Sequence, residues 1–379
     1  MKWSYVGPGY GKKFFPNDIN KYKSQFSGNT GNLIYYFATQ CVIDFSGRPM
    51  SVGTDTSIFN REGAGIVLSL ANQLGFHTDL SKRGLSLCNL NVPVIGLGLG
   101  AQVKTKTDDI SFIPEGTISW LRDFFERRKG AAITLRGDYT LSLMEKLGFS
   151  NNVVSIGCQT NFISSDKRLG ENIYKKICGN ELERINIAAG SPFNKELRSL
   201  EASLLRMAVQ SGGDYIVQHP ESFISLAANF SDDDFEKSFE KIFPAFSSYG
   251  FSEAEFRGAV RKNFRLYNDA VNWMLSHRST DVVVGTRIHG VQSAIQSGVP
   301  AICLYIDSRT HELCEKMKIP HVSASSFEAG ISKSQIESIL KDWDFEEFDR
   351  NRLELAKKME KFLDDNSVPL GRSLKALVD

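Results

Sequence analysis

The chain has 379 residues, of which 41% are hydrophobic and 23% are charged. This length is too great for one ordinary hydrophobic core, so we expect a globular protein with two domains. The formal net charge of +1 at pH 7 gives no general basis for binding nucleic acid.

Targeting and metal-binding signals are missing from the sequence. No stretch reaches the roughly 18 apolar residues of a membrane helix, and the amino terminus lacks the apolar core of a signal peptide. The six cysteines show no zinc-binding spacing, so we expect buried free thiols and no metal. We therefore expect a cytoplasmic protein. The lysines before residue 24 would allow at most peripheral contact with the inner face of the membrane, and a solvated basic tail is the simpler alternative.

Apolar periodicity in the first half of the chain predicts alternating strands and helices, which is typical of a parallel sheet. The first 27 residues look irregular. The expected helices are 33–42, 66–74, 118–127 and 140–147, and the expected strands are 92–97, 131–135 and 153–156.

The second half repeats this alternation and ends in helices. We predict strands at 185–189, 214–220 and 301–305, helices at 196–210 and 345–363, and a helical lid or cover within 231–278. This pattern divides the chain into a first α/β domain at 1–178, a second at 179–345 and a helical tail at 346–379. We expect the tail to cross back onto the first domain.

The most informative segment is 281–290, Asp-Val-Val-Val-Gly-Thr-Arg-Ile-His-Gly. A β-branched run predicts a buried parallel strand, and a glycine then turns the chain into a helix that begins near Arg287 and His289. Ligands of α/β sheets bind at the carboxyl ends of strands, where Arg and a helix amino terminus suit an anion. The alternative is structural: Arg287 would pair with a neighbouring acid, and His289 would be a hydrogen-bonded core residue.

This segment, followed by Ser-Gly-Val-Pro-Ala at 297–301, resembles the signature of the polysaccharide pyruvyltransferases. The glycine-rich turn that ends at Gln102, the segment Thr-Leu-Arg-Gly-Asp-Tyr-Thr that carries Arg136, and the Asn/Gly-rich turn at 28–32 are similar to other motifs of that family. The matches run in order from about residue 28 to residue 320.

The resemblance implies two Rossmann-like domains facing each other across a cleft, as in glycosyltransferases of the B type. It implies transfer of pyruvate from phosphoenolpyruvate to two hydroxyls of one sugar, giving a cyclic ketal and free phosphate. The first domain would bind the acceptor, a sugar or lipid-linked oligosaccharide of a cell-surface polysaccharide, and the second would bind the donor. Such chemistry needs cationic groups, a general acid and a base, but no cofactor.

Four residues match the expected donor site. Arg287 and His289 are the predicted catalytic residues, with Arg287 holding phosphate or carboxylate and His289 contacting phosphate or supplying a proton. The predicted donor-binding set is Arg136, Arg287, His289 and Arg309. Two alternatives stay open at this point: Arg136 pairs with Asp138, and Arg309 is an ordinary surface arginine.

Three further residues, Asn32, Gln102 and His219, are candidate cleft residues, although a core position is the alternative for His219. Asn32 stands where the family commonly has an acid, and Cys-Gln-Thr at 158–160 replaces a common Asp-Pro. Both departures leave the acceptor and the general base undefined. The base candidates, chosen only because they lie near strand or turn boundaries, are Asp44, Asp55 and Glu115.

Other functions are open to the same fold. Gly96, Gly98 and Gly100 lack the third spacing of a dinucleotide fingerprint, so we expect them to let the backbone turn tightly instead of binding NAD. The remaining alternatives are a nucleotide-sugar glycosyltransferase and a non-catalytic sugar-binding relative. The set of Arg136, Arg287 and His289 argues against a mere binding module.

Overall fold

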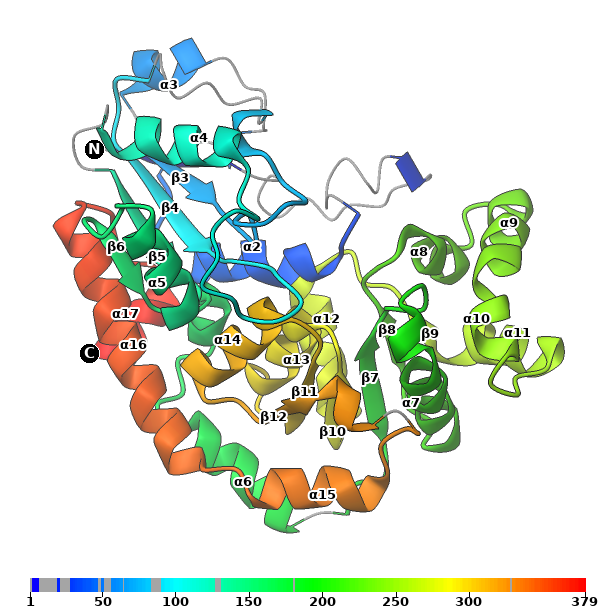
Figure 1. Ribbon diagram of the computed structural model, residues 1–379. Coiled ribbons are helices and arrows are strands. Elements are labelled where there is room, and N and C mark those ends of the chain that lie inside the picture. Colours follow the sequence, from blue (N-terminus) through cyan, green and yellow to red (C-terminus); the bar gives the residue numbers. More distant parts are fainter. Residues whose placement is uncertain are drawn as a thin grey trace.

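The computed structural model describes residues 2–6, 19–20, 28–46, 49–50, 56–63, 65–82, 90–126, 131–179, 181–327 and 329–379. Two six-stranded parallel sheets with flanking helices form two α/β domains, as the sequence predicted (Figure 1). Among these residues, none of the helices combines the length and apolar character needed to cross a membrane.

The first sheet has the strand order β2-β1-β3-β4-β5-β6. Its strands are β1 (Trp3–Val6), β2 (Pro49–Met50), β3 (Gly65–Ser69), β4 (Val94–Leu99), β5 (Ala132–Leu135) and β6 (Val153–Ser155). The helices in this part of the chain are α2 (Gly31–Val42), α3 (Thr56–Glu62), α4 (Glu115–Glu126), α5 (Asp138–Lys146) and α6 (Leu169–Gly179). The order reverses between β1 and β3, which makes that edge a topological switch point.

The second sheet has the order β12-β11-β10-β7-β8-β9, which is the dinucleotide-fold order 3-2-1-4-5-6 read backwards. Its strands are β7 (Ile185–Ala189), β8 (Tyr215–Val217), β9 (Phe264–Arg265), β10 (Val282–Gly285), β11 (Ala301–Tyr305) and β12 (His321–Ser323). The switch point of this sheet lies between β7 and β10.

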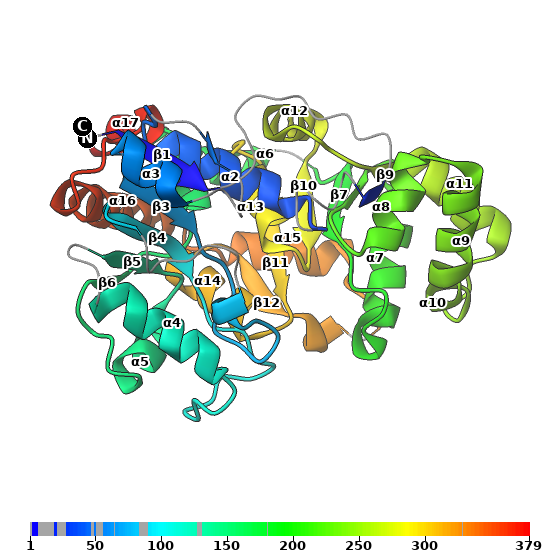
Figure 2. The ribbon, with the colours of Figure 1, turned by 90° about the horizontal axis from the view of Figure 1, so that it is seen from above.

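Helices cover the second sheet and connect it back to the first. They are α7 (Arg198–Gln210), α8 (Glu221–Ala228), α9 (Asp232–Ile242), α10 (Pro244–Ser247), α11 (Glu253–Asn263), α12 (Ala270–Ser276), α13 (Ile288–Ile295), α14 (Ser308–Met317), α15 (Lys333–Lys341), α16 (Phe345–Asp365) and α17 (Arg372–Val378). The segment 231–278 is helical, as expected, but α9, α10 and α11 are not a lid between the domains: they lie beyond β9, on the side of the second domain that faces away from the first (Figures 1 and 2). Helix α12 of the same segment packs against α2 and α13.

Two expectations about the first sheet are also wrong. The segment 66–74 was expected to be a helix, but 65–69 is strand β3, which pairs with β1 and β4 and is buried on both faces. The segment is a continuous apolar run, and such a run shows neither the two-residue repeat of a strand nor the 3.6-residue repeat of a helix. The irregular start predicted for the chain contains β1, whose pairing with β2 and β3 is non-local and invisible to periodicity.

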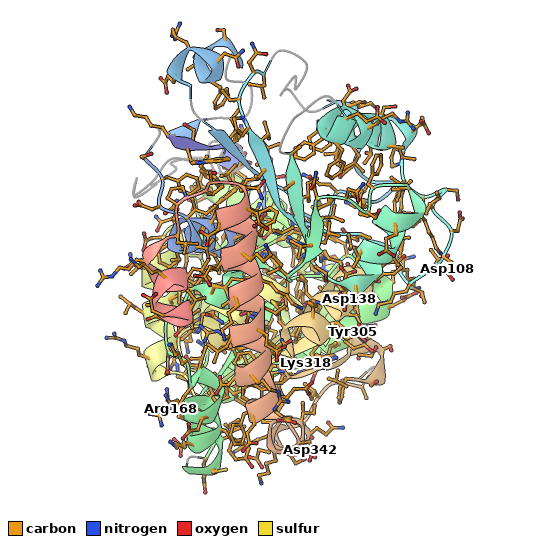
Figure 3. The ribbon with its side chains drawn as sticks, turned by 90° about the vertical axis from the view of Figure 1, so that its left-hand side faces the viewer. Asp108, Asp138, Arg168, Tyr305, Lys318 and Asp342 are labelled. Atoms are coloured by element: carbon orange, nitrogen blue, oxygen red, sulfur yellow. The ribbon has the colours of Figure 1, made fainter. Side chains whose placement is uncertain are left out.

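The carboxyl-terminal helix α16 packs against the first domain, as expected, and runs beside both domains (Figure 3). Near its start, the Asp349 carboxylate accepts hydrogen bonds from the first backbone N–H groups of α6, at Gly170 and Glu171. Near its end, Met359 and Leu363 join a buried cluster with Trp3 of β1. Helix α16 therefore contacts both α6, whose apolar side chains pack into the core of the second sheet, and β1 of the first sheet.

Helix α2 makes the central contact between the domains. The Thr30 backbone N–H donates to the Gln218 carbonyl at 3.0 Å, and its hydroxyl donates to the Val217 carbonyl at 3.0 Å. The helix that follows packs against α13 of the second domain and α17. The Asn/Gly-rich turn therefore holds the first domain against the carboxyl end of β8.

Candidate active site

Arg287 lies at the switch point of the second sheet. The chain leaves β10 at Gly285, where a Cβ atom would stand 1.9 Å from the Ala188 carbonyl oxygen, so only glycine fits. Arg287 then occupies the N-cap position of α13, and its Nη2 donates to the carbonyl of Gly190, just after β7. Its guanidinium is therefore fixed between the ends of two neighbouring strands.

Arg136 follows β5 of the first domain and is 2% exposed. Its Nε donates to the Gly98 carbonyl at 3.0 Å, and a Cβ atom on Gly100 would stand 2.6 Å from its Cδ. Gly98 has a φ of +71°, so these glycines shape the β4 turn around the arginine. Asp138 is not its partner, because that carboxylate forms an ion pair with Lys316 at 2.8 Å.

Arg309 belongs to the first turn of α14, and its side chain is only 16% exposed, so it is not an ordinary surface arginine. Its Nη2 lies 3.4 Å from Asp307 Oδ2. The same carboxylate oxygen accepts a hydrogen bond of 2.9 Å from Gln102 Nε2. Gln102, predicted as a cleft residue, therefore links the first domain to the amino terminus of α14 through this hydrogen bond.

His289, in the first turn of α13, points toward the first domain. Its ring centroid is 5.7 Å from that of Tyr35, and its Nε2 is 3.9 Å from Cys158 Sγ. Burial lowers the pKa of His289 well below its usual value, and the charges of Arg136 and Arg309 lower it further. The imidazole is therefore neutral at neutral pH.

Charge repulsion links the three arginines through Arg309. Burial lowers the pKa of Arg287 to about 10, and repulsion by Arg309 adds to the shift. Burial also lowers the pKa of Arg136, with Arg309 again contributing. Each domain thus supplies cations to one common region at its strand ends.

A polysaccharide pyruvyl transferase family model matches residues 8–308, which is most of the chain. The chain belongs to the polysaccharide pyruvyl transferase family. A comparison with curated proteins finds no significant match.

Solved structures offer only distant likenesses. A glycosyltransferase from Rickettsia africae ESF-5 has 11% identity and a TM-score of 0.39, over 88% of this chain and 81% of that one. The UDP complex of S. aureus MnaA has 12% identity and a TM-score of 0.42, with coverages of 99% and 94%. The wall teichoic acid polymerase TagF has 10% identity and a TM-score of 0.36, with coverages of 100% and 87%. Likenesses at this level carry no information about chemistry.

The structure brings two other predicted residues to the site. Asn32 lies in the first turn of α2, beside Gly31, where a Cβ atom would stand 3.4 Å from His289 Cβ. His219 reaches solvent, although neighbouring groups shield part of its ring, and its Nδ1 lies 3.3 Å from the Gly28 carbonyl oxygen. This partial desolvation and the charge of Arg287 lower the pKa of His219. The core position considered for His219 is therefore wrong.

The base candidates do not lie with these residues. Asp44 is exposed beyond the carboxyl end of α2, roughly 18 Å along a 12-residue helix from the turn that contacts His289. Glu115 is exposed at the start of α4. Asp55 lies outside the described residues. Proximity to a strand or turn boundary was too weak a signal to find a base.

Sequence reasoning missed two buried carboxylates that support the arginines. Glu201 of α7 accepts hydrogen bonds from the Ser191 backbone N–H at 2.8 Å and the Tyr215 hydroxyl at 2.7 Å. It thereby fixes the loop after β7 on which Arg287 rests. Glu201 lies within a predicted amphipathic helix, and nothing in that pattern sets it apart from a solvated acid.

The second is Glu312, which bridges the domains. Its Oε1 accepts a 2.7 Å hydrogen bond from the Thr140 hydroxyl in α5, and its Oε2 accepts one of 3.2 Å from the Thr140 backbone N–H. Glu312 lies one helical turn after Arg309, so both point from the same face of α14. Burial raises its pKa to about 7, although these hydrogen bonds and Arg136 oppose the shift.

Two arginine N–H groups in this region lack a protein partner. The Nε atoms of Arg287 and Arg309 are buried and have no hydrogen-bond partner among the described residues. Buried donors without partners are costly, and charged donors more so. An anion placed between the two domains would satisfy them.

Proposed function

We propose that this protein transfers pyruvate from phosphoenolpyruvate to two hydroxyls of one sugar in a polysaccharide or its lipid-linked precursor. The product is a cyclic pyruvate ketal, and phosphate is released. The observation that carries the proposal is a neutral His289 with cations from both domains near it: the charges of Arg136 and Arg309 lower its pKa, and Arg287 stands two residues before it at the same helix amino terminus. Membership of the pyruvyl transferase family supports it.

The donor matches the charge and shape of this region. Phosphoenolpyruvate carries a phosphate and a carboxylate on adjacent atoms, and each is an anion that a guanidinium binds through two parallel N–H bonds. Arg287 and Arg309 offer buried, unpaired N–H groups for them. Both lie at strand ends or helix amino termini of the second sheet, where backbone dipoles also favour negative charge.

The reaction requires two proton losses, two proton gains and one bond cleavage. A proton adds to the methylene carbon of phosphoenolpyruvate, which makes C2 electrophilic, and one sugar hydroxyl attacks C2 and loses its proton. The C2–O bond to phosphate then breaks, and phosphate leaves with that oxygen and takes up a proton. The second hydroxyl attacks C2, loses its proton and closes the ketal. Two protons leave the hydroxyls, one enters the methyl group and one ends on phosphate.

His289 is the group we assign to the first proton transfer. Without ligand it is neutral, because burial and two neighbouring arginines disfavour the imidazolium. The two anionic groups of the donor would neutralise those arginines and raise the pKa of His289, so the imidazole becomes protonated only when substrate is bound. A proton donor formed in this way is ready to protonate the methylene carbon.

The experiment is phosphate release from phosphoenolpyruvate with a panel of simple and lipid-linked sugar acceptors. We expect acceptor-dependent release by the wild type and loss of release in His289→Ala, with little change in the melting temperature of the variant. Thermal shifts with phosphoenolpyruvate and with nucleotide sugars run beside it, because saturation at 100 times the dissociation constant adds about 2.7 kcal/mol. A shift with nucleotide sugars only, and no phosphate release, would contradict the proposal.

A further inference from the structure

The loop that follows β3 lies at the switch point of the first sheet, on the same strand-end edge as Arg136. Its backbone is tied to the end of β4: the Leu74 N–H donates to the Gly100 carbonyl at 3.1 Å, and the Gln102 N–H donates to the Leu74 carbonyl at 2.9 Å. Gly100 is also the residue against which Arg136 packs. The loop is therefore held rigidly beside one side of the proposed donor site.

This loop presents an aromatic ring to solvent. Phe76 is 78% exposed, and its ring makes an edge-on contact with His77, with centroids 5.9 Å apart. A single exposed apolar residue is ordinary on a protein surface. Phe76 differs in its position, since strand ends at a switch point are where ligands of α/β sheets bind.

Polar groups link this ring to the arginines across the domain interface. His77 Nε2 lies 2.8 Å from the Asn72 carbonyl oxygen, and Asn72 Nδ2 donates to Gln102 Oε1. Gln102 donates in turn to Asp307, which contacts Arg309. The side chain of Asn72 is thus two hydrogen bonds from the carboxylate that holds a donor-site arginine.

A second observation points to a polar ligand here. Gln73, next to Asn72 in the loop, is 7% exposed, and its Oε1 is buried without a hydrogen-bond partner among the described residues. Buried amide oxygens are nearly always paired, so an unpaired acceptor in this loop suits the hydroxyl of a ligand.

We propose that Phe76, Asn72 and His77 form a subsite for the pyranose ring of the acceptor. A pyranose has an apolar C–H face, which suits the electron-rich face of a phenyl ring, and a rim of hydroxyls, which suits amide and imidazole groups. A ring stacked on Phe76 would have its rim beside Asn72, with its hydroxyls directed across Gln102 toward the donor. This inference rests on the proposed function and identifies its acceptor side.

The test compares Phe76→Ala with Phe76→Trp, which keeps an aromatic face. Tyr249→Ala is the matched control, because Tyr249 is an aromatic residue 37% exposed between α10 and α11, away from the first domain. The probes are methyl glucoside, methyl galactoside and methyl mannoside at saturating phosphoenolpyruvate. Phosphate release gives the KM of each acceptor, and saturation-transfer NMR gives binding for any probe that is not turned over.

We expect Phe76→Ala to raise the KM, or the dissociation constant, of the best probe by about 10-fold or more. Phe76→Trp and Tyr249→Ala should stay near the wild-type value, and phosphoenolpyruvate should bind equally to all four proteins. Unchanged acceptor affinity in Phe76→Ala, or no binding of any pyranoside to the wild type, would overturn the subsite while leaving the donor site intact. Failure of the wild type to bind phosphoenolpyruvate would instead overturn the proposed function.

Discussion

Two arginines of this protein, the fully buried Arg352 and the half-buried Arg287, have similarly lowered pKa values but differ in their hydrogen bonds. Burial lowers the pKa of each to about 10. Arg352 of α16 is 0% exposed and donates to three backbone carbonyls, those of Asn161, Ser164 and Asp166. Arg287 donates to Gly190, but its buried Nε has no hydrogen-bond partner within the part of the chain that the structure describes.

This difference shows how to distinguish an arginine that stabilises the fold from one that binds a ligand. A lowered pKa reports only that a guanidinium is out of water, and it is the same for both residues. The hydrogen bonds distinguish the two residues. Arg352 donates to backbone carbonyls of the 161–166 segment and holds it against α16, whereas the Nε–H of Arg287 is left for a ligand to accept. The first should matter for stability, and the second for ligand binding.

The largest effect is expected at Arg287. Arg287→Ala should lower kcat/KM for phosphoenolpyruvate by about 10²–10³-fold, because it removes a fixed charge from the anion site. The free energy of unfolding should change little by comparison. Steady-state kinetics and thermal unfolding measure the two quantities, and Arg287→Lys should recover only part of the activity because it lacks the planar fork. Full activity in either variant would remove Arg287 from the site.

Arg352 should show the reverse behaviour. Arg352→Met keeps much of the side-chain volume but removes the donor from one buried and two part-buried carbonyls, so we expect a loss of about 3 kcal/mol in unfolding free energy. Activity per folded molecule, measured well below the melting temperature, should stay close to that of the wild type. A variant that is stable but inactive would show that the hydrogen-bonding criterion fails.

Glu312 extends the comparison to a buried carboxylate, whose effect on stability should change with pH. Its folded-state pKa of about 7 lies above the usual carboxyl value, so the folded protein holds this proton between about pH 4.5 and 7 while the unfolded chain releases it. The carboxylate therefore costs stability as the pH rises through that window, by up to about 3 kcal/mol. Glu312→Gln copies the protonated form. It should match the wild type near pH 4.5 and exceed its melting temperature at pH 8.

The test is the sign of the difference in melting temperature between Glu312→Gln and the wild type at pH 8. A Glu312→Gln protein less stable than the wild type at pH 8 would mean that the ionised carboxylate is stabilised by Arg136 more than it is destabilised by burial. Thr140→Val is a useful companion, because it removes the hydroxyl that donates to Glu312 without adding a charge. Thermal unfolding across the pH range measures both variants.

The smallest effect is a fraction of one proton at His289. At pH 7.5 its imidazole is neutral in the free protein, and a bound dianion beside it should raise its pKa. Calorimetric titration with phosphoenolpyruvate, in two buffers of different ionisation enthalpy, should show more proton uptake by the wild type than by His289→Asn. The variant also corrects for protons exchanged by the ligand itself. Equal uptake would mean that His289 does not become protonated on binding.

The strand, turn and helix start that carry Arg287 and His289 were predicted well from the sequence. A β-branched strand, a turn glycine and a helix start are consecutive in 281–290, so their geometry follows from local preferences. Arg136 was found for the same reason, at the end of a short buried strand. The strand β3 was not, because an apolar run buried on both faces has the same composition as a buried helix.

The contacts between the domains could not be predicted from one sequence. Glu312 is 172 residues from its partner Thr140, and Cys158 is 131 residues from His289. Nothing local distinguishes Glu312 from a surface acid of an amphipathic helix, because only the folded chain shows which side of α14 meets α5. The sequence showed that Cys158 departs from the family pattern, but it could not show that the Cys158 side chain lies beside His289.

The most direct test of the account is calorimetric titration of phosphoenolpyruvate into the wild type, Arg287→Ala and Arg352→Met proteins at one pH and salt concentration. If the unpaired arginine marks the donor site, the wild type and Arg352→Met will bind with similar affinity, and Arg287→Ala will bind at least about 10-fold more weakly. Equal affinity in all three proteins would contradict that claim, and so would no binding to the wild type.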